Sequence, residues 1–400
     1  MAVALDDNAI QGIGLNVLGT EYAMPNDEND RWDAVVIGAG PAGAIAARQL
    51  ALQHKRVLLI DKARWPRDKV CGGCLGGAAL ALLDHIGLGH VPNACRGLSL
   101  RTFELSSGGI TARIPIGRRI AISRREFDDA LVREAQRVGV VVRYQTQGIV
   151  HPDIFESFRR VTLRQVENEE SVLASVVVVA TGLAAVPPRC GTQTASDSFV
   201  GLGALSAHRP DNIVPGSLYM ACGTAGYVGV TAVKRGRFDI AAAVDPNAVA
   251  AAGSPGQIIR EILHASGSTL AFDWQSLDWQ GTPRLTRRAT PIALHRLLLI
   301  GDAAAYVEPF TGEGIGWAMQ SGALAASVLA GPHRQWESAI EGRWQQLFDK
   351  MIGDRHSLCH AISRCMRVRP FRHLAAWGLS KAPFLGGPVV RILDRPICTN

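Results

Sequence analysis

The pattern Gly38-Ala39-Gly40-Pro41-Ala42-Gly43 constrains the fold of this chain more than any other feature of its sequence. It follows the apolar run 34–37, which is typical of a buried parallel strand, and it opens an alanine-rich helix expected over 42–53. A second apolar run, 56–60, ends in Asp61, 23 residues after the first glycine of the pattern. In such a strand–helix–strand unit, the glycines let the backbone approach a pyrophosphate at the helix N-terminus, and the acid binds ribose hydroxyls. The sequence therefore predicts a dinucleotide-binding site rather than an ordinary turn between a strand and a helix.

A second motif indicates which dinucleotide is bound. The apolar run 297–300 leads into Gly301-Asp302, and a glycine-rich stretch, 308–316, follows. An aspartate at the carboxyl end of a strand lies where ligands bind in such sheets, and it could hold the hydroxyls of a ribityl chain. The glycines would bring backbone N–H groups and a helix N-terminus against a flavin ring. These features favour FAD over NAD, the alternative being a strand–turn–helix corner with a capping aspartate.

With both motifs in place, the chain resembles the FAD-dependent oxidoreductases of the para-hydroxybenzoate hydroxylase and geranylgeranyl reductase type. The loop 66–73 is similar to the segment that runs beside the flavin in that family, and 123–128 is similar to its Arg-x-x-Phe-Asp element. Gly226–Val230 resembles a strand of the family's substrate domain. The resemblance runs from about Asp33 to Ala330. We expect a flavin that is bound non-covalently, because no histidine or cysteine stands in a clear attachment motif.

The expected fold is α/β, with a doubly wound, Rossmann-like FAD-binding domain, an inserted and mostly antiparallel substrate sheet, and a helical C-terminal cap. A hairpin is predicted from 98–105 and 110–116, and neighbouring antiparallel strands from 218–221, 227–233 and 237–244. The predicted parts are a loose leader (1–31), the FAD-binding domain (32–92, 118–184 and 285–332), the substrate domain (93–117 and 185–284) and a basic cap (333–400).

The motifs and the resemblance together assign a set of residues to the cofactor. These are Gly38, Gly40, Pro41, Ala42, Gly43, Asp61, Lys62, Arg67, Cys71, Gly72, Gly73, Arg124, Gly301, Asp302, Pro309, Gly312, Gly314 and Ile315. Arg124 stands at an expected helix start, where a cation is unfavourable unless an anion lies near, so we expect a phosphate or ribose contact there. No metal is expected, because the histidines form no ligand pattern, and no catalytic residue is assigned.

The reaction is less sharply indicated than the cofactor. Many hydroxylases of the family end the strand before the middle domain with Asp-Gly, whereas this chain has Thr181-Gly182, so NADPH or NADH as the direct electron donor is unsupported. The Trp-x-Trp-x-Ile-Pro element of flavin halogenases is absent, and Tyr227–Val230 replaces the aromatic-Pro element of isoprenoid reductases. We therefore expect a monooxygenase acting on a small or medium, apolar or aromatic metabolite. The alternatives are a reductase of carbon–carbon double bonds in an isoprenoid or other lipid, and a flavin-binding electron-transfer protein without turnover of its own.

Several side chains near the motifs allow two interpretations. Cys71 and Cys74 form a CxxC that could be a redox pair beside the flavin or small packing residues. Arg67 and Lys69 could stabilise the reduced flavin or lie in a solvated loop. Glu313 could be a general base, although stabilisation of the next helix N-terminus is favoured.

Composition and charge limit the partners. Residues 331–400 hold 11 Lys or Arg and 5 Asp or Glu, and this segment carries most of the net charge of +7, so a nucleic-acid partner is not expected. The basic C-terminal helices could contact a membrane surface or a donor or carrier protein, or they could form an amphipathic cap with a solvated arginine face. Eight scattered cysteines, no signal-peptide pattern and no apolar run of about 18 residues predict a cytoplasmic protein with free thiols.

Overall fold

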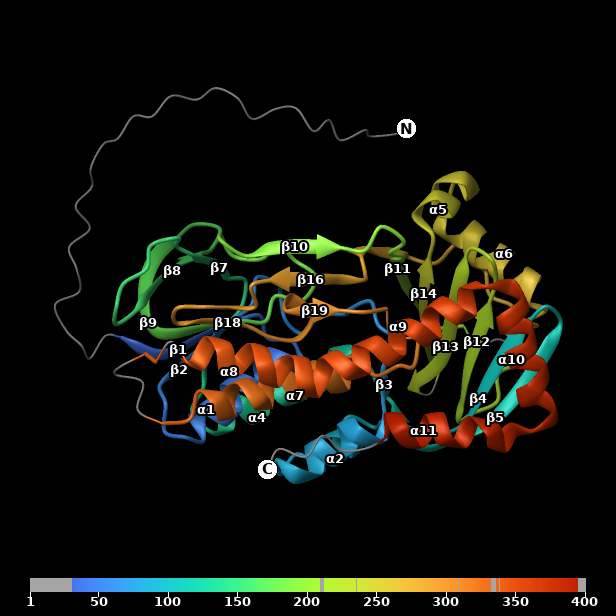
Figure 1. The fold of residues 1–400 in the computed structure, drawn as a ribbon, viewed down its shortest axis with the longest axis horizontal. Helices are drawn as coiled ribbons and strands as arrows, with labels where there is room; N and C mark the ends of the chain where they lie inside the picture. The colour runs from blue at the N-terminus through green and yellow to red at the C-terminus, as the bar shows by residue number, and fades with distance from the viewer. Residues whose placement is uncertain are drawn as a thin grey trace, which may run out of the picture.

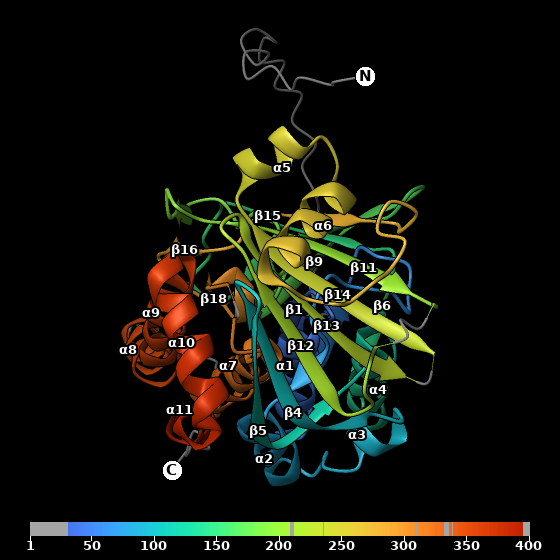
Figure 2. The ribbon, with the colours of Figure 1, turned by 90° about the vertical axis from the view of Figure 1, so that its right-hand side faces the viewer.

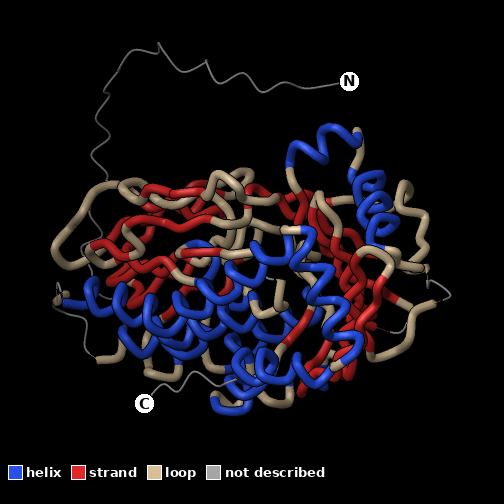
Figure 3. The backbone as a smooth tube through the Cα atoms, turned by 45° about the vertical axis from the view of Figure 1, so that its right-hand side comes forward, coloured by secondary structure: helices blue, strands red, loops and turns tan. Residues whose placement is uncertain are grey.

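The computed structural model describes residues 31–394, apart from 209–211, 235, 309, 332–335 and 338 (Figure 1). The predicted leader lies outside the described residues except for Arg31, and the predicted cofactor contact Pro309 also lies outside them. Two large sheets lie side by side, and Figure 3 shows most helices gathered on one side of the strands.

The first sheet, sheet A, is built around the predicted strand–helix–strand unit. Its main strands run in the order β17-β18-β9-β1-β2-β6, and β1 is parallel to both β2 and β9. These strands are β17 (Ala293–Leu294), β18 (Leu297–Leu299), β9 (Glu169–Val179), β1 (Trp32–Ile37), β2 (Val57–Ile60) and β6 (Val141–Arg143). The strands β7 (Gln147–Val150) and β8 (Arg159–Arg164) extend this sheet beside β9. Continuous apolar runs such as 34–37 and 176–179 are buried, as expected for parallel strands that helices cover.

Three helices form the layer against sheet A. They are α1 (Pro41–Ala51), α4 (Arg124–Arg137) and α7 (Gly314–Val328), and α1 packs against both of the others. Two shorter helices follow Leu75 in the sequence: α2 (Gly77–His85) packs against α7, and α3 (Val91–Ala94) packs against α4. The close approach of α7 to α1 depends on Gly322, where an added Cβ would lie 2.2 Å from the backbone oxygen of Ala42. The expectation of an α/β fold with a Rossmann-like parallel sheet is thereby confirmed.

The second sheet, sheet B, is mostly antiparallel, as predicted. Its order is β15-β11-β14-β13-β12-β4-β5-β3, and the β12–β4 pair is its parallel exception. The strands are β15 (Gln280–Arg284), β11 (Val200–Ser206), β14 (Arg237–Val244), β13 (Gly226–Lys234), β12 (Ser217–Cys222), β4 (Leu98–Ser107), β5 (Ile110–Ala121) and β3 (Cys74–Leu75). The predicted hairpin is present as β4–β5, and β12, β13 and β14 are neighbours as expected. Helix α6 (Pro255–Ser266) packs on β12 and β13, and α5 (Pro246–Ala252) packs on α6.

A small third sheet pairs strands whose pairing the sequence analysis did not predict. It has the order β10-β16-β19 and comprises β10 (Gly191–Thr194), β16 (Arg287–Thr290) and β19 (Ala305–Tyr306). Its short strands connect the end of sheet A to sheet B, so that the two sheets are held around a shared space.

The C-terminal segment is helical, as predicted, and lies along the outside of both sheets (Figure 2). It comprises α8 (Ala339–Phe348), a π-helical turn η3 (Asp349–Gly353), α9 (Asp354–Arg367), α10 (Arg369–Lys381), a 3₁₀ turn η4 (Pro383–Gly386) and α11 (Gly387–Leu393). The Trp344 indole N–H donates to the backbone oxygen of Leu299, which attaches α8 to sheet A. Helices α10 and α11 pack against β5. Among the described residues, no helix has the length and apolar character needed to cross a membrane.

Candidate functional site

A cavity of about 520 Å³ lies where the two large sheets meet. One wall is formed by the carboxyl ends of β1, β2, β9 and β18, and the opposite wall by strands β11 to β14 of sheet B. Most of the predicted cofactor residues line it: Gly38, Gly40, Pro41, Ala42, Asp61, Lys62, Arg67, Cys71, Gly72, Gly73, Arg124, Asp302, Gly312, Gly314 and Ile315. Parallel sheets bind ligands at this edge, so the fold brings both sequence motifs to one place.

Gly43 and Gly301 lie beneath the cavity surface rather than on it. An added Cβ at Gly43 would lie 1.8 Å from the backbone oxygen of Gly38, so no side chain fits there. Gly38 itself has φ +106°, and its added Cβ would meet the backbone of Ala180 at 2.3 Å. Gly301 has φ +57° and packs against α1. These glycines set the close packing of the loop, while Gly40 keeps the space above the N-terminus of α1 open.

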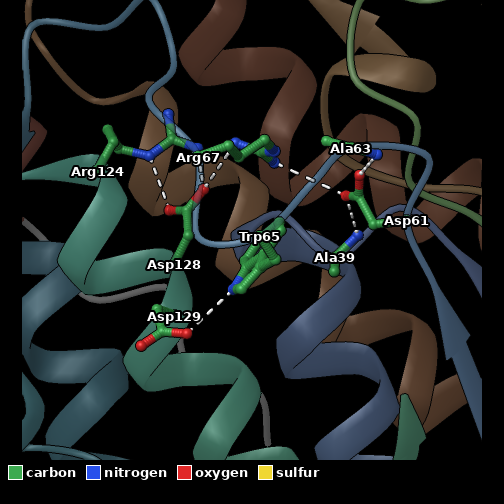
Figure 4. A network of polar contacts seen from close by, with 8 residues as sticks. All are labelled: Ala39, Asp61, Ala63, Trp65, Arg67, Arg124, Asp128 and Asp129. Atoms are coloured by element: carbon green, nitrogen blue, oxygen red, sulfur yellow. Dashed lines mark hydrogen bonds and ion pairs between the residues drawn. The ribbon is translucent and has the colours of Figure 1, made fainter. Parts of the chain in front are cut away.

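The Asp61 carboxylate is held in place by backbone donors (Figure 4). One of its oxygens accepts a hydrogen bond from the N–H of Ala39 at 2.9 Å, and the other accepts from the N–H of Ala63 at 2.9 Å. The guanidinium of Arg67 lies 3.9 Å from the same carboxylate. Each carboxylate oxygen has a second lone pair, so Asp61 can still accept from ribose hydroxyls.

Arg124 has an anion beside it within the protein. It donates two hydrogen bonds to Asp128, at 2.8 and 2.7 Å, and Arg67 lies 3.4 Å from Asp128 (Figure 4). The pKa of the Arg124 guanidinium is raised well above its usual value, because the attraction of Asp128 and Cys71 outweighs burial. This bidentate pair accounts for a cation at a helix start without a phosphate. The predicted contact of Arg124 with FAD therefore rests on its place in the cavity wall.

Asp302 and Lys69 both line the cavity, and each shifts the pKa of the other. Asp302 follows β18 in the 3₁₀ turn η2 (Gly301–Ala303), and burial raises the pKa of its carboxyl although Lys69 and Arg124 oppose that shift. The Lys69 ammonium is open to the cavity, and partial desolvation by the surrounding walls lowers its pKa, as does the charge of Arg67. Both Arg67 and Lys69 line the cavity, which favours a cofactor-facing role for this loop over a fully solvated one.

The wall from sheet B carries a candidate functional residue that the sequence analysis missed, Asp239 on β14. Burial raises the pKa of its carboxyl from 3.8 to about 8, with Arg124 opposing the shift and Asp68 adding to it. Thr231 is its cross-strand partner on β13, and the Thr231 hydroxyl is buried without a hydrogen-bond partner among the described residues. The signal in the sequence was a single acid inside the apolar strand 237–244.

Cys71, Cys74 and Glu313 take up more ordinary roles than the redox or base alternatives. Both cysteines are free, and burial raises the pKa of each thiol, that of Cys74 to about 11. Protonated thiols are poor nucleophiles, which favours packing. Glu313 makes no side-chain capping bond to α7; it forms a buried ion pair with Arg119 at 2.9 Å. Glu313 does stand at the N-cap position of α7, as the sequence favoured, but its carboxylate binds Arg119 instead of the helix N–H groups, and it is not part of the cavity wall.

The residues present fit FAD. The glycine loop and the N-terminus of α1 leave room for a pyrophosphate, Asp61 offers acceptors for a ribose, and Asp302 lies at the cavity edge for a ribityl chain. Within the residues that the structure describes, no cluster of His, Cys, Asp and Glu could hold a metal ion.

Comparison with known families decides the assignment. The FAD binding domain family matches residues 31–340. The chain belongs to this family. It is therefore an FAD-dependent oxidoreductase, and FAD is its cofactor.

Curated relatives match along most of their length. A menaquinone reductase of Mycobacterium tuberculosis is 28% identical over 347 residues, which cover 80% of this chain and 82% of the relative. A digeranylgeranylglycerophospholipid reductase of Methanosarcina mazei is 26% identical over 330 residues, which cover 75% of each chain. The chain is similar to both.

Solved structures share the fold at low identity. A flavoprotein/dehydrogenase from Cytophaga hutchinsonii superposes with a TM-score of 0.76 at 18% identity, covering 90% of this chain and 92% of the other. A flavin-dependent brominase superposes with a TM-score of 0.73 at 18% identity, covering 91% of this chain and 93% of the other.

Proposed function

We propose that this protein is an FAD-dependent reductase that saturates carbon–carbon double bonds in the chain of an isoprenoid lipid. Two of its curated relatives are named as reductases of a menaquinone and of a digeranylgeranylglycerophospholipid. Both named substrates carry polyprenyl chains, and the reducible groups that they share are the double bonds of those chains. These relatives support the reductase alternative better than the monooxygenase that the sequence motifs favour.

The observation that carries the proposal is the wall that sheet B contributes to the cavity. It presents apolar and small side chains, including Leu218, Met220 and Ala241, opposite the wall that carries the predicted FAD-binding loops. Within this apolar surface, Asp239 offers a carboxyl whose raised pKa keeps it protonated at neutral pH. A largely apolar wall that carries a protonated carboxyl suits an alkene, which has no polar group to bind but needs a proton when it is reduced.

Saturation of a double bond adds a hydride to one carbon and a proton to the other. Reduced FAD, when bound, supplies the hydride and is left oxidised. Asp239 holds the proton and gives it to the second carbon, and its carboxylate then takes a proton from solvent. The cations Arg124 and Arg237, which both lower the pKa of Asp239, limit the cost of that transient charge. The walls of the cavity hold the polyprenyl chain and exclude water from the reacting bond.

The test is an analysis of the products formed by the full-length protein after its bound FAD has been reduced. FAD-loaded protein is reduced anaerobically with dithionite and mixed with a geranylgeranyl phospholipid, and the product is analysed by mass spectrometry. We expect the gain of two hydrogen atoms per reacted double bond and the return of the oxidised flavin spectrum. A parallel sample receives labelled O₂ and the same lipid.

The other outcomes discriminate the alternatives. Incorporation of labelled oxygen into the lipid would replace the reductase by the monooxygenase. Flavin that stays reduced in the presence of lipid, yet passes electrons to a one-electron acceptor, would indicate an electron-transfer protein. Halogenation gains no support from the structural neighbours, because identity at this level shows the fold alone.

A further inference from the structure

Large apolar side chains are exposed mainly on the last helices of the described chain. Of thirteen such residues in the described part of the chain, eight lie between 368 and 392. They are Val368, Phe371, Leu374, Trp377, Phe384, Leu385, Val389 and Ile392, and we call them the tail patch. Soluble monomers rarely expose apolar side chains in so concentrated a group, so the tail patch calls for a partner.

The orientation of α10 is the reverse of that expected for a solvated helix. Phe371, Leu374 and Trp377 follow one another at helical spacing and are 59%, 62% and 53% exposed. Arg372 on the opposite face is buried, and it donates to the backbone oxygen of Arg367 and to the Thr224 hydroxyl. The sequence alternative of an amphipathic cap with a solvated arginine face does not describe this helix, because the apolar row faces outward.

The row continues through the turn η4 onto α11. Phe384 in η4 is 75% exposed, and Leu385, Val389 and Ile392 follow at spacings of four and three residues. The helix is held from its inner side, because the Asp394 carboxylate accepts from the N–H of Gly77 at 3.0 Å and pairs with Arg119 at 3.1 Å. Figure 2 shows α10 and α11 together at one outer edge of the molecule.

The charge around the tail patch has one sign. Residues 355–393 contain seven Lys or Arg and no Asp or Glu. Arg369, Lys381 and Arg391 are exposed beside the apolar row. Arg364 and Arg367 are paired with Asp197 instead, so they are not counted toward this surface. An apolar row flanked by cations complements a surface that is apolar inside and anionic outside.

We propose that the tail patch docks the protein on the surface of a membrane that contains anionic lipid. The aromatic and aliphatic side chains of α10, η4 and α11 enter the boundary between headgroups and acyl chains, and Lys381 and Arg391 contact lipid phosphates. The helices lie in the plane of the surface, because α10 spans only Arg369–Lys381 and α11 only Gly387–Leu393.

The docked helix shares a core with the cavity. The inner side of α10 contributes Ala376 and Leu379 to an apolar cluster that also contains Met220, Tyr227 and Phe310, and these last three line the cavity. An enzyme whose substrate is a lipid gains from holding its cavity next to the bilayer. Membrane docking does not itself rest on the proposed reductase activity, and it is measured without turnover.

The test is cosedimentation of the full-length, FAD-loaded protein with vesicles of phosphatidylcholine alone or mixed with phosphatidylglycerol. We expect recovery with the mixed vesicles and at least about tenfold weaker partitioning with the neutral ones. The double variant Trp377→Ser/Phe384→Ser should lose about tenfold or more in partitioning to mixed vesicles, and Lys381→Glu/Arg391→Glu should lose the preference for the anionic lipid. Val166→Ser is the matched control, because Val166 is 97% exposed on the distant turn between β8 and β9.

Each result decides for or against docking. Wild-type and Val166→Ser protein should sediment alike, and all variants should retain bound FAD and a cooperative unfolding transition. Equal recovery of wild-type protein with and without anionic lipid would overturn the proposal. So would a stable dimer in light scattering that Trp377→Ser/Phe384→Ser converts to a monomer, because a second copy would then cover the tail patch. Failure of the reductase assay together with lipid binding would refute only the function.

Discussion

Replacement of Asp239 by asparagine tests two properties with one variant: the pH dependence of the free energy of unfolding, and the proposed role of the carboxyl as proton donor. The carboxyl has a pKa of about 8 in the folded protein against 3.8 when it is free of the fold. Between these two values the folded state holds a proton that the unfolded state has lost. The free energy of unfolding of the wild type therefore falls as the pH rises through this window, and Asp239→Asn removes that dependence.

The magnitude follows from the size of the pKa shift. A shift from 3.8 to about 8 corresponds to about 6 kcal/mol once the pH exceeds 8, because each unit is worth about 1.4 kcal/mol. The buried amide of asparagine has unmet hydrogen bonds of its own, which offset about 1–3 kcal/mol of this gain. The variant should therefore be about 3 kcal/mol or more stable than the wild type at pH 8, and this advantage should be lost as the pH falls toward 5, because the wild-type penalty then becomes comparable to the cost of the buried amide.

Denaturant unfolding of wild type and variant between pH 5 and pH 9, with FAD in constant excess, measures the effect. The control is Asp84→Asn, because the Asp84 carboxylate is about half exposed, pairs with Arg118 at 3.0 Å and does not contribute to the pKa shift of Asp239. That variant should lose no more than about 1 kcal/mol. A variant Asp239→Asn that is less stable than the wild type at pH 8, or that differs from it equally at all pH values, would refute the reasoning.

The same variant bears on catalysis. If Asp239 gives the proton, reduction of the lipid should slow by about 10²- to 10⁴-fold in Asp239→Asn while FAD content stays unchanged. Wild-type activity should be maintained at neutral pH and fall as the pH rises through about 8, since the carboxyl then loses its proton. An unchanged rate in the variant would remove Asp239 from the mechanism without affecting the stability argument.

Three further substitutions test separate parts of the site. Arg119→Met removes the ion-pair partner of the buried Glu313, at 2.9 Å, and of Asp394, at 3.1 Å. The free energy of unfolding, measured in urea, should fall by about 3–5 kcal/mol. A loss under about 1 kcal/mol would show that these ion pairs are not held as the structure has them. Gly43→Ala places a Cβ 1.8 Å from a backbone oxygen of the glycine loop, and purified protein should carry little flavin absorbance; full FAD content would contradict the close packing of α1 on that loop. Cys74→Ser should leave the flavin spectrum unchanged and the rate within about twofold, because a thiol with a pKa of about 11 is protonated at neutral pH; a lost activity with intact FAD binding would restore the redox alternative.

The parts of the fold that the sequence predicts are those set by local patterns. The run 34–37, the glycine pattern and Asp61 lie within one strand–helix–strand unit, and the structure has them as β1, α1 and β2. The hairpin β4–β5 is also local, since its strands are joined by a short turn. In each case the period of the apolar residues and the turn glycines suffice.

Pairings across long stretches of sequence could not be predicted in the same way. The parallel contact of β12 with β4 joins Ser217 to Thr102, and the third sheet joins Gly191 to Thr290. The partner of Glu313 is Arg119, 194 residues away. Glu313 stands at the N-cap position of α7, as the local pattern predicted, but its carboxylate pairs with the buried cation that β5 supplies. Local patterns show that a charge needs a partner, but only the tertiary fold shows which one it has.

Asp239 and the tail patch, which carry the functional proposals, also owe their environments to the tertiary fold rather than to local sequence. Asp239 interrupts an apolar strand, and its pKa is raised because its carboxyl is buried in the wall of the cavity rather than exposed to water. The apolar residues of α10 repeat at helical spacing, which predicts a helix but does not say which face is covered. In the structure Ala376 is buried and Trp377 is exposed, although both are apolar neighbours in sequence. The proposed functions therefore depend on places where the fold departs from the simplest burial of apolar and charged side chains, and those departures occur beside the cavity and along the tail patch.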